Sequence, residues 1–261
     1  MAPGVVEAYA AGLELLGHEV AGVVAMRNRR RPDAAEAILR AAPGAVFADT
    51  KQELVPALEQ IAPDVAICSG WGWRIPPEAI AVPRRGIVNG HPSKLPRWRG
   101  PNPLGWTLRA DDPELGFTFH YMDADFDTGA ILAQGTTPLR GDEFARHLFP
   151  LLRPVVAPLL VRALERVAAG DPGDPQPEEG ATYAGHFEDE FAELDWTQPA
   201  RAVFDQIRCW FIPSKSGILG PLTTLDGERV RVLDASLEPG EGREVECGDG
   251  HAVWVRETEP V

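Results

Sequence analysis

The sequence predicts an α/β fold, with a mostly parallel sheet in the first two thirds of the chain and a small, mostly β module at its end. Short apolar segments alternate with helical patterns over residues 5–169, and a parallel strand that is buried on both faces reads as a continuous apolar run. A stretch rich in Gly and Pro at 170–180 has the composition of a linker. With 261 residues and 44% hydrophobic content, the chain can bury a substantial core.

The first domain is expected to contain the alternating elements of βαβ units. Apolar residues with helical spacing, ended by Gly17, open the chain, and strictly alternating residues mark one strand after the Pro/Gly turn near residue 100. Prolines 150, 154 and 158 are expected to kink or interrupt the long last helix. In chain order we expect helix 5–16, strand 19–25, helix 33–41, strand 45–48, helix 52–61, strands 64–69 and 86–89, helix 104–109, strand 117–122 and helix 142–169.

The C-terminal module is expected to hold one helix, 199–207, followed by short strands compatible with a barrel. The strands are expected around Thr223, 230–233, Val245 and 253–255. The predicted domains are therefore 1–170, a linker at 171–182, and 183–261. A doubly wound sheet usually begins with its central strand, whereas this chain opens on a helix, so we expect the first strand to lie upstream of Met1.

The net charge of −14 is concentrated at one end of the chain. From Asp171 onward there are 20 acidic and 7 basic side chains, a composition that repels phosphate backbones and disfavours nucleic acid as a partner of this region. No apolar run of about 20 residues and no signal segment are recognised, which predicts a cytoplasmic protein without a membrane partner. The three cysteines have no metal-ligand spacing, so no metal site is expected.

Asn89 and His91 stand two residues apart at the end of a predicted buried strand. In extended chain their side chains leave the same face, and ligands of open parallel sheets bind at the carboxyl ends of strands. A carboxamide donor beside an imidazole suits the stabilisation of a developing oxyanion together with proton transfer. A single His in this position is as often a hydrogen-bonded structural residue.

The segment after the alternating strand carries three carboxylates, Asp123, Asp125 and Asp127, which would affect one another's pKa if they were buried. Asp127-Thr-Gly is also compatible with a simple Asx turn. His120 with His91 and Asp123 is a weak metal alternative that lacks the usual spacing. Trp71 and Trp73 would form a flat apolar wall, either in the core or in a ligand cleft. No phosphate-binding glycine loop is present, which disfavours dinucleotide redox chemistry.

Taken together, these motifs resemble the 10-formyltetrahydrofolate-dependent formyltransferases, a family that includes methionyl-tRNA formyltransferase and the sugar and amino-acid N-formyltransferases. An Asn-x-His, Ser-x-Leu-Pro, Arg-Gly and Asp-Thr-Gly series occurs in that order, and the resemblance extends over nearly the whole chain. The similar segments are 87–106, 116–123, 127–132, 71–76, 176–183, 194–196 and 207–208.

The resemblance implies a Rossmann-like catalytic domain and an OB-like C-terminal barrel, with 10-formyltetrahydrofolate as formyl donor. It implies that Asn89 and His91 stabilise the formyl oxygen and that Asp127 orients His91 or a water. It further implies that the pterin lies against the backbone near residues 74–75 and the 123–127 loop. The folate-binding residues implied in this way are Trp73, Arg74, Ile75, Asp123, Asp125 and Phe126.

Departures from the family pattern concern the acceptor. Lys94 stands where the family usually has Leu, the barrel is short and acidic, and only the run 26–31 is basic where transfer-RNA-formylating members carry a longer basic insertion. We therefore expect a small-molecule amine, such as an amino sugar nucleotide or an amino-acid derivative, as the acceptor. Methionyl-tRNA as acceptor, a formyltetrahydrofolate hydrolase and an inactive folate-binding module are the alternatives. Family members include monomers and dimers, so a homodimer stays open.

Overall fold

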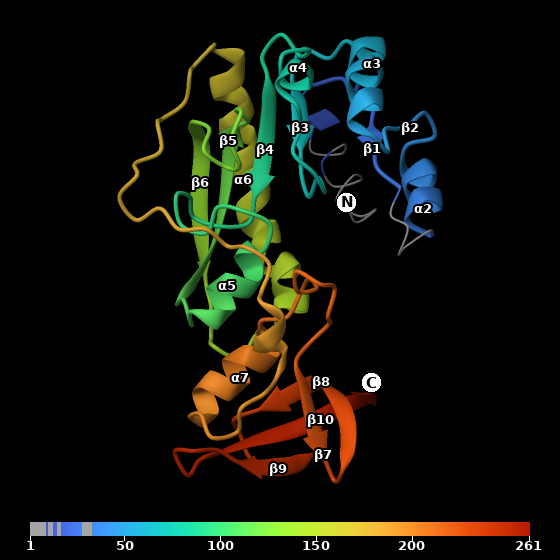
Figure 1. Cartoon of the computed structure of the whole chain (residues 1–261). Coiled ribbons are helices and arrows are strands. Elements are labelled where there is room, and N and C mark those ends of the chain that lie inside the picture. The colour runs from blue at the N-terminus through green and yellow to red at the C-terminus, as the bar shows by residue number, and fades with distance from the viewer. Residues whose placement is uncertain (1–8, 10–12, 15–16, 28–32) are drawn as a thin grey trace. The chain divides into compact units, whose positions relative to one another are not determined.

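A computed structural model of the chain describes residue 9 and residues 13–14, 17–27 and 33–261 (Figure 1). Most of the predicted helix 5–16 and most of the basic run 26–31 lie outside the described residues. The chain divides into two compact units that interleave along the sequence. The first comprises Met1–His91, Thr118–Gln134 and Val156–Pro177, and the second comprises Pro92–Phe117, Gly135–Val155 and Glu178–Val261. The domain boundaries given above stay a prediction.

The first unit begins with two parallel strands, β1 (Val24–Ala25) and β2 (Val46–Phe47), joined by helix α2 (Asp33–Ala41). Both strands are shorter than the apolar runs that predict them, whereas α2 has the predicted bounds. The charges of α2 complement its dipole, because its acidic side chains lie in the first turn and Arg40 lies in the last.

Helix α3 (Lys51–Ile61) begins at the N-cap Thr50. The carboxylate of Glu53 accepts hydrogen bonds from the backbone N–H groups of Asp49 and Thr50, which pair donors that the helix itself leaves unsatisfied. Ala62, in the left-handed conformation at φ 49°, ends the helix.

The second sheet of the α/β part has the order β3-β4-β5-β6. Its elements are β3 (Ala66–Cys68), the short helix α4 (Pro77–Ile80), β4 (Ile87–His91), helix α5 (Pro103–Arg109), β5 (Glu114–Tyr121) and β6 (Ile131–Pro138). Strand β4 runs parallel to β3 and antiparallel to β5, so the sheet is mixed. The sequence did not predict β6, because its residues do not alternate, nor α4, which is only one turn long. All five residues of β4 are buried, as its uninterrupted apolar start predicts.

A hydrophobic cluster connects α3, β3, α4 and β4 within the first unit. Its buried members are Ala48, Leu54, Leu58, Cys68, Ile75, Ala79 and Ile87. Trp71 and Trp73 pack against it with their rings edge to face, 5.0 Å apart at 74°. The expectation of a flat aromatic wall was therefore wrong, because the edge-to-face arrangement is the one that ring quadrupoles favour.

Helix α6 (Leu148–Ala168) follows a 3₁₀ turn, Ala145–His147, and is continuous. The helix is not interrupted, so that part of the expectation was wrong, whereas a kink at the prolines stays a prediction. Pro150, Pro154 and Pro158 recur every four residues on the exposed side, where water can satisfy the carbonyl groups that lose a partner. The stretch 145–168 also contains an 18-residue window, with mean hydropathy 1.4, that is long and apolar enough to cross a membrane by length and composition alone. A core helix of a soluble protein passes the same test, and Leu148, Leu152, Leu159, Leu160, Ala163, Leu164 and Val167 are buried in the fold.

The C-terminal part of the second unit contains the 3₁₀ turn Asp189–Ala192, helix α7 (Ala200–Arg208) and a four-stranded antiparallel sheet of order β7-β8-β10-β9. The strands are β7 (Leu222–Leu225), β8 (Glu228–Ser236), β9 (Arg243–Glu246) and β10 (Ala252–Pro260). Although β7 and β9 are opposite edges, Asp226 after β7 pairs with Arg243 at the start of β9. The sheet is therefore curled into a half-barrel that buries Val203, Phe204, Val232 and Val253 (Figure 1).

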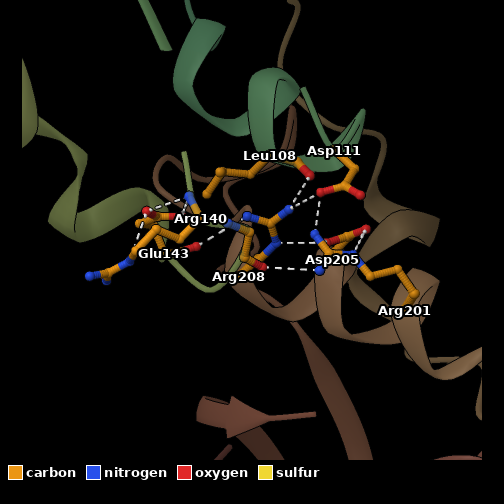
Figure 2. Close-up of polar contacts among 8 residues, drawn as sticks. Leu108, Asp111, Arg140, Glu143, Arg201, Asp205 and Arg208 are labelled. Atoms are coloured by element: carbon orange, nitrogen blue, oxygen red, sulfur yellow. Dashed lines mark hydrogen bonds and ion pairs between the residues drawn. The ribbon is translucent and has the colours of Figure 1, made fainter. Parts of the chain in front are cut away.

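A buried arginine joins three segments of the second unit (Figure 2). Arg208, 1% exposed, donates from Nε to Asp205 Oδ1 at 2.6 Å and from Nη2 to Asp111 Oδ1 at 2.9 Å. The carbonyl oxygens of Glu143 and Leu108 accept one further hydrogen bond each, at 3.4 Å. Burial raises the pKa of the Asp205 carboxyl, and the Arg208 charge opposes that rise. Because Asp111 and Leu108 lie at the end of α5, these hydrogen bonds connect α7 to that end of the helix.

Candidate active site

Four polar side chains share one face of the β4–β5 pair. Asn89 and His91 alternate along β4, and their cross-strand partners in the antiparallel register are His120 and Thr118. All four are buried, with exposures from 0% to 9%. A polar face inside a sheet requires internal hydrogen bonds, and Thr118 accepts one from Gln134 at 2.9 Å.

Asp127 approaches this face from the loop between β5 and β6. Asn89 Nδ2 donates to Asp127 Oδ1 at 3.2 Å, and His91 Nδ1 lies 3.6 Å from Asp127 Oδ2. The side chain of Asp127 is 12% exposed. The structure thus brings the three predicted catalytic side chains together, although 38 residues separate Asn89 from Asp127.

The Asp-Thr-Gly sequence has a backbone reason. Asp127 has φ +56°, a left-handed conformation that Asp tolerates better than most residues. A Cβ on Gly129 would lie 1.8 Å from the carbonyl oxygen of Tyr121. Only Gly therefore lets the loop return against the end of β5 and present the Asp127 carboxylate to β4.

Two further residues belong to the site and were not predicted in this role. His120, which the sequence suggested only as a weak metal ligand, has Nε2 3.2 Å from Asn89 Nδ2 and 3.6 Å from Asp127 Oδ1. Gln176, which lies in the predicted linker, donates from Nε2 to the carbonyl oxygens of Asp127 at 2.9 Å and Gly129 at 2.8 Å. The alternation of Thr118 and His120 with Phe117 and Phe119 carried the signal for His120, whereas nothing in the linker composition singled out Gln176.

The predicted folate-binding residues fall into two groups. Ile75 is buried and Trp73 is partly buried, and both pack in the hydrophobic cluster, so mainly their backbone is left for a ligand. Arg74 reaches the 123–127 loop, where it donates to the Ala124 carbonyl oxygen and lies 3.2 Å from Asp125 Oδ1.

The carboxylate of Asp123 shapes the same loop, because it accepts hydrogen bonds from Thr128 Oγ1 at 2.7 Å and from the Asp125 N–H at 3.1 Å. Phe126 is 50% exposed. Asp123 and Asp125 are exposed as well, so the burial that the expected mutual charge effect requires is absent.

The environment of Cys68 excludes catalysis by a cysteine nucleophile. Burial, with a smaller contribution from the Asp127 charge, raises the pKa of the Cys68 thiol to about 12. Burial likewise raises the pKa of Tyr9 to about 12, against a hydrogen bond with Ser69 that lowers it. Cys68 therefore stays a protonated thiol at neutral pH and is no nucleophile. Among the described residues, no group of His, Cys, Asp and Glu side chains could hold a metal ion.

The family profile that describes formyl transferases matches residues 18–162, a segment that contains Asn89, His91 and Asp127. The chain belongs to the formyl transferase family. It is 38% identical over 202 residues to the methionyl-tRNA formyltransferase of Ruegeria pomeroyi, covering 74% of this chain and 65% of that protein. With the methionyl-tRNA formyltransferase of Anaeromyxobacter dehalogenans it shares 34% identity over 271 residues, which cover 93% of this chain and 85% of that one.

Solved structures of formyl transferases have a similar fold. WlaRD, a sugar 3N-formyl transferase solved in the presence of dTDP and 5-N-formyl-THF, aligns with a TM-score of 0.69 at 16% identity and covers 96% of this chain and 93% of its own. The methionyl-tRNA formyltransferase of Clostridium thermocellum aligns with a TM-score of 0.61 at 17% identity, covering 92% and 98%. At these identities the likeness shows the fold alone.

Proposed function

We propose that this protein transfers a formyl group from 10-formyltetrahydrofolate to a primary amine. The observation that carries the proposal is the convergence of Asn89, His91 and Asp127 at the end of β4, in a chain of the formyl transferase family. The three groups supply an N–H donor, a proton-transferring imidazole and a carboxylate, the set that acyl transfer to an amine needs.

Each residue has a separate role in this proposal. The N–H of Asn89 and the His91 imidazole stabilise the negative charge that develops on the formyl oxygen as the amine attacks the formyl carbon. Asp127, 3.6 Å from His91 Nδ1, orients the ring or a water between them. His91 and Asp127 then take up the proton that the amine loses, and it moves to the folate nitrogen as the old C–N bond breaks and the new one is complete.

The residues around 71–76 and 123–127 fit a folate. The indole Nε1 of Trp71 is buried and has no hydrogen-bond partner among the described residues, so a donor is left for a ligand that offers acceptors. When bound, the folate supplies the formyl carbon and the leaving nitrogen. Trp73, Arg74, Ile75, Asp123, Asp125 and Phe126 would hold it, the buried Ile75 through its backbone and Phe126 through its exposed ring.

For the acceptor, we propose the amine of methionyl-tRNA. Proteins of that name are 32–38% identical to this chain over as much as 93% of its length, which favours this acceptor over the small-molecule amine expected from the sequence.

A small amine, such as an amino sugar nucleotide, is the second candidate. One observation favours it: the segment 183–261 carries 16 acidic and 7 basic side chains, a field that opposes the approach of a phosphate backbone. We also propose that the curled sheet of the segment 183–261 is an OB-like module.

The test is a formyl-transfer assay with the whole chain, 10-formyltetrahydrofolate and two acceptor pools, charged initiator methionyl-tRNA and a panel of amino sugar nucleotides, with products followed by mass. Formyl-methionyl-tRNA supports the first acceptor, and its formation should slow steeply with added salt because phosphate contacts release counterions. A formylated sugar nucleotide as product supports the small amine as the acceptor instead. Formate released without any amine would indicate a hydrolase, and folate binding without turnover would indicate a binding module; either result overturns the proposal.

A further inference from the structure

We propose that His120 is a positioning residue, which holds the carboxamide of Asn89 in the orientation that formyl transfer requires. The inference rests on the proposed function, since Asn89 matters here as a donor to the formyl oxygen. His120 itself lies one strand away on β5, is 1% exposed and is not among the residues that the sequence placed in the reaction.

The tautomer of His120 follows from its neighbours. Nδ1 lies 2.7 Å from the backbone carbonyl oxygen of Tyr121, which can only accept a hydrogen bond, so Nδ1 carries the proton. In the neutral ring Nε2 is then an acceptor, and the group opposite it is Asn89 Nδ2 at 3.2 Å. The ring therefore receives a hydrogen bond from Asn89.

The orientation of the carboxamide is fixed independently. The ionised carboxylate of Asp127 accepts and cannot donate, so the amino group of Asn89, not its oxygen, faces Asp127 Oδ1 at 3.2 Å. A reversed carboxamide would point its oxygen at both a carboxylate and an imidazole lone pair. His120 in the Nδ1–H form and Asp127 thus select the same amide rotamer.

The consequence concerns how Asn89 meets its substrate. Both of its N–H groups are engaged, one by His120 and one by Asp127. To bind the formyl oxygen, Asn89 must give up one of these two acceptors. Asp127 sits on a loop, whereas His120 is fixed by the strand register and by its bond to Tyr121, so the bond to His120 is the one that stays. His120 then keeps the carboxamide plane in place, and the formyl oxygen replaces Asp127 Oδ1 as the acceptor of the second N–H.

A purely structural histidine at this place would stabilise the fold without affecting turnover, and two experiments separate the roles. The first is nitrogen NMR of the whole, ligand-free chain with ¹⁵N-labelled histidines, in which the His120 signals are assigned by their loss in His120→Gln. We expect the Nδ1–H tautomer for His120 and a shift of its Nε2 resonance in Asn89→Ala. An Nε2–H tautomer, or an Nε2 resonance that ignores Asn89→Ala, overturns the inference.

The second experiment compares His120→Leu with His120→Gln in the transfer assay. Leu removes the acceptor, so we expect kcat to fall about tenfold or more with KM for the folate unchanged, since a small misplacement of a catalytic group has effects of this size. Gln places a carbonyl oxygen near the Nε2 position and should recover most of kcat. Wild-type kcat in folded His120→Leu overturns the inference. If the wild type transfers no formyl group, the proposed function fails, and the NMR result still decides whether His120 holds Asn89.

Discussion

In the described part of the chain, the polar cluster around Arg208 and the polar cluster around Asp127 differ in how tightly their members are paired. Around Arg208, the two ion-pair contacts measure 2.6 and 2.9 Å, and two backbone carbonyl oxygens accept further hydrogen bonds at 3.4 Å. Around Asp127, the contacts to Asn89, His91 and His120 measure 3.2, 3.6 and 3.6 Å. The first cluster is held by short ion pairs, whereas the contacts that Asp127 makes in the second are longer.

This difference separates stability from chemistry. Removing one partner from a buried ion-pair cluster costs much stability, because a charge is then left in a low-dielectric interior. A cluster with longer contacts loses less stability when one of its side chains is removed, but the variant loses a group that stabilises the charge developing in the reaction. The two clusters should therefore respond to mutation in different measurements, stability for Arg208 and turnover for Asp127.

The largest effect on folding is expected for Arg208→Met. The substitution leaves the Asp205 carboxylate buried, at a cost of about 3–5 kcal/mol in the free energy of unfolding. Denaturant unfolding measures it. The matched control is Arg201→Met, which removes another partner of Asp205 from a side chain that is 38% exposed and should cost about 1 kcal/mol or less. Equal losses of unfolding free energy in the two variants would contradict the expectation that the buried Arg208 stabilises the fold more than the partly exposed Arg201.

At the other cluster, Asn89→Ala and His91→Ala are expected to lower turnover at least about a hundredfold, the usual effect of losing one oxyanion donor. The fold should survive, because neither side chain belongs to the hydrophobic cluster of the first unit. Steady-state kinetics and thermal unfolding on the same preparations check both statements. Turnover near that of the wild type in either variant would refute the assigned role.

The contrast also shows what the sequence could reveal. Asn89 and His91 were predicted because an Asn-x-His pattern at a strand end fixes their common face. Asp127 was predicted because its Asp-Thr-Gly segment resembles the family pattern, since the residues alone also fit a simple turn. His120 and Gln176 were not, because their roles depend on the register between β4 and β5 and on where the linker crosses the loop. Such relations belong to the tertiary structure and leave no pattern in the local sequence.

The same limit applies to the fold. Helices α2, α3, α5 and α7 were predicted within one or two residues, since caps and periodicity are local. The continuity of α6 was not, because the tolerance of its prolines depends on which side of the helix faces water.

An intermediate effect is expected for Gln176→Leu, which keeps the side-chain size and removes both hydrogen bonds to the 127–129 segment. The left-handed turn at Asp127 loses its outer support, so kcat should fall about tenfold through misplacement of the carboxylate. Stability should change by only about 1–2 kcal/mol, the net worth of two hydrogen bonds. Gln176→Glu, which turns one donor into an acceptor against two carbonyl oxygens, should be at least as impaired. Full activity in both variants would show that Gln176 is not needed to hold the Asp127 carboxylate in place.

The smallest effect is expected at an exposed ion cluster that resembles neither of the two. Arg166 donates to Asp171 and Asp174, and these hydrogen bonds hold the pKa values of both carboxyl groups below the ordinary 3.8. A carboxyl whose pKa is lower in the folded state adds stability above its unfolded pKa and loses it as the pH falls through the folded value. Arg166→Gln should therefore be less stable than the wild type at pH 7, and the gap should narrow below about pH 4. Urea unfolding at pH 7 and pH 3 measures this, with Arg162→Gln on the same helix as control. A gap that stays constant between the two pH values would mean that Arg166 acts through packing of its stem and its bonds to the Ile131 and Leu132 carbonyl oxygens, not through the carboxylates.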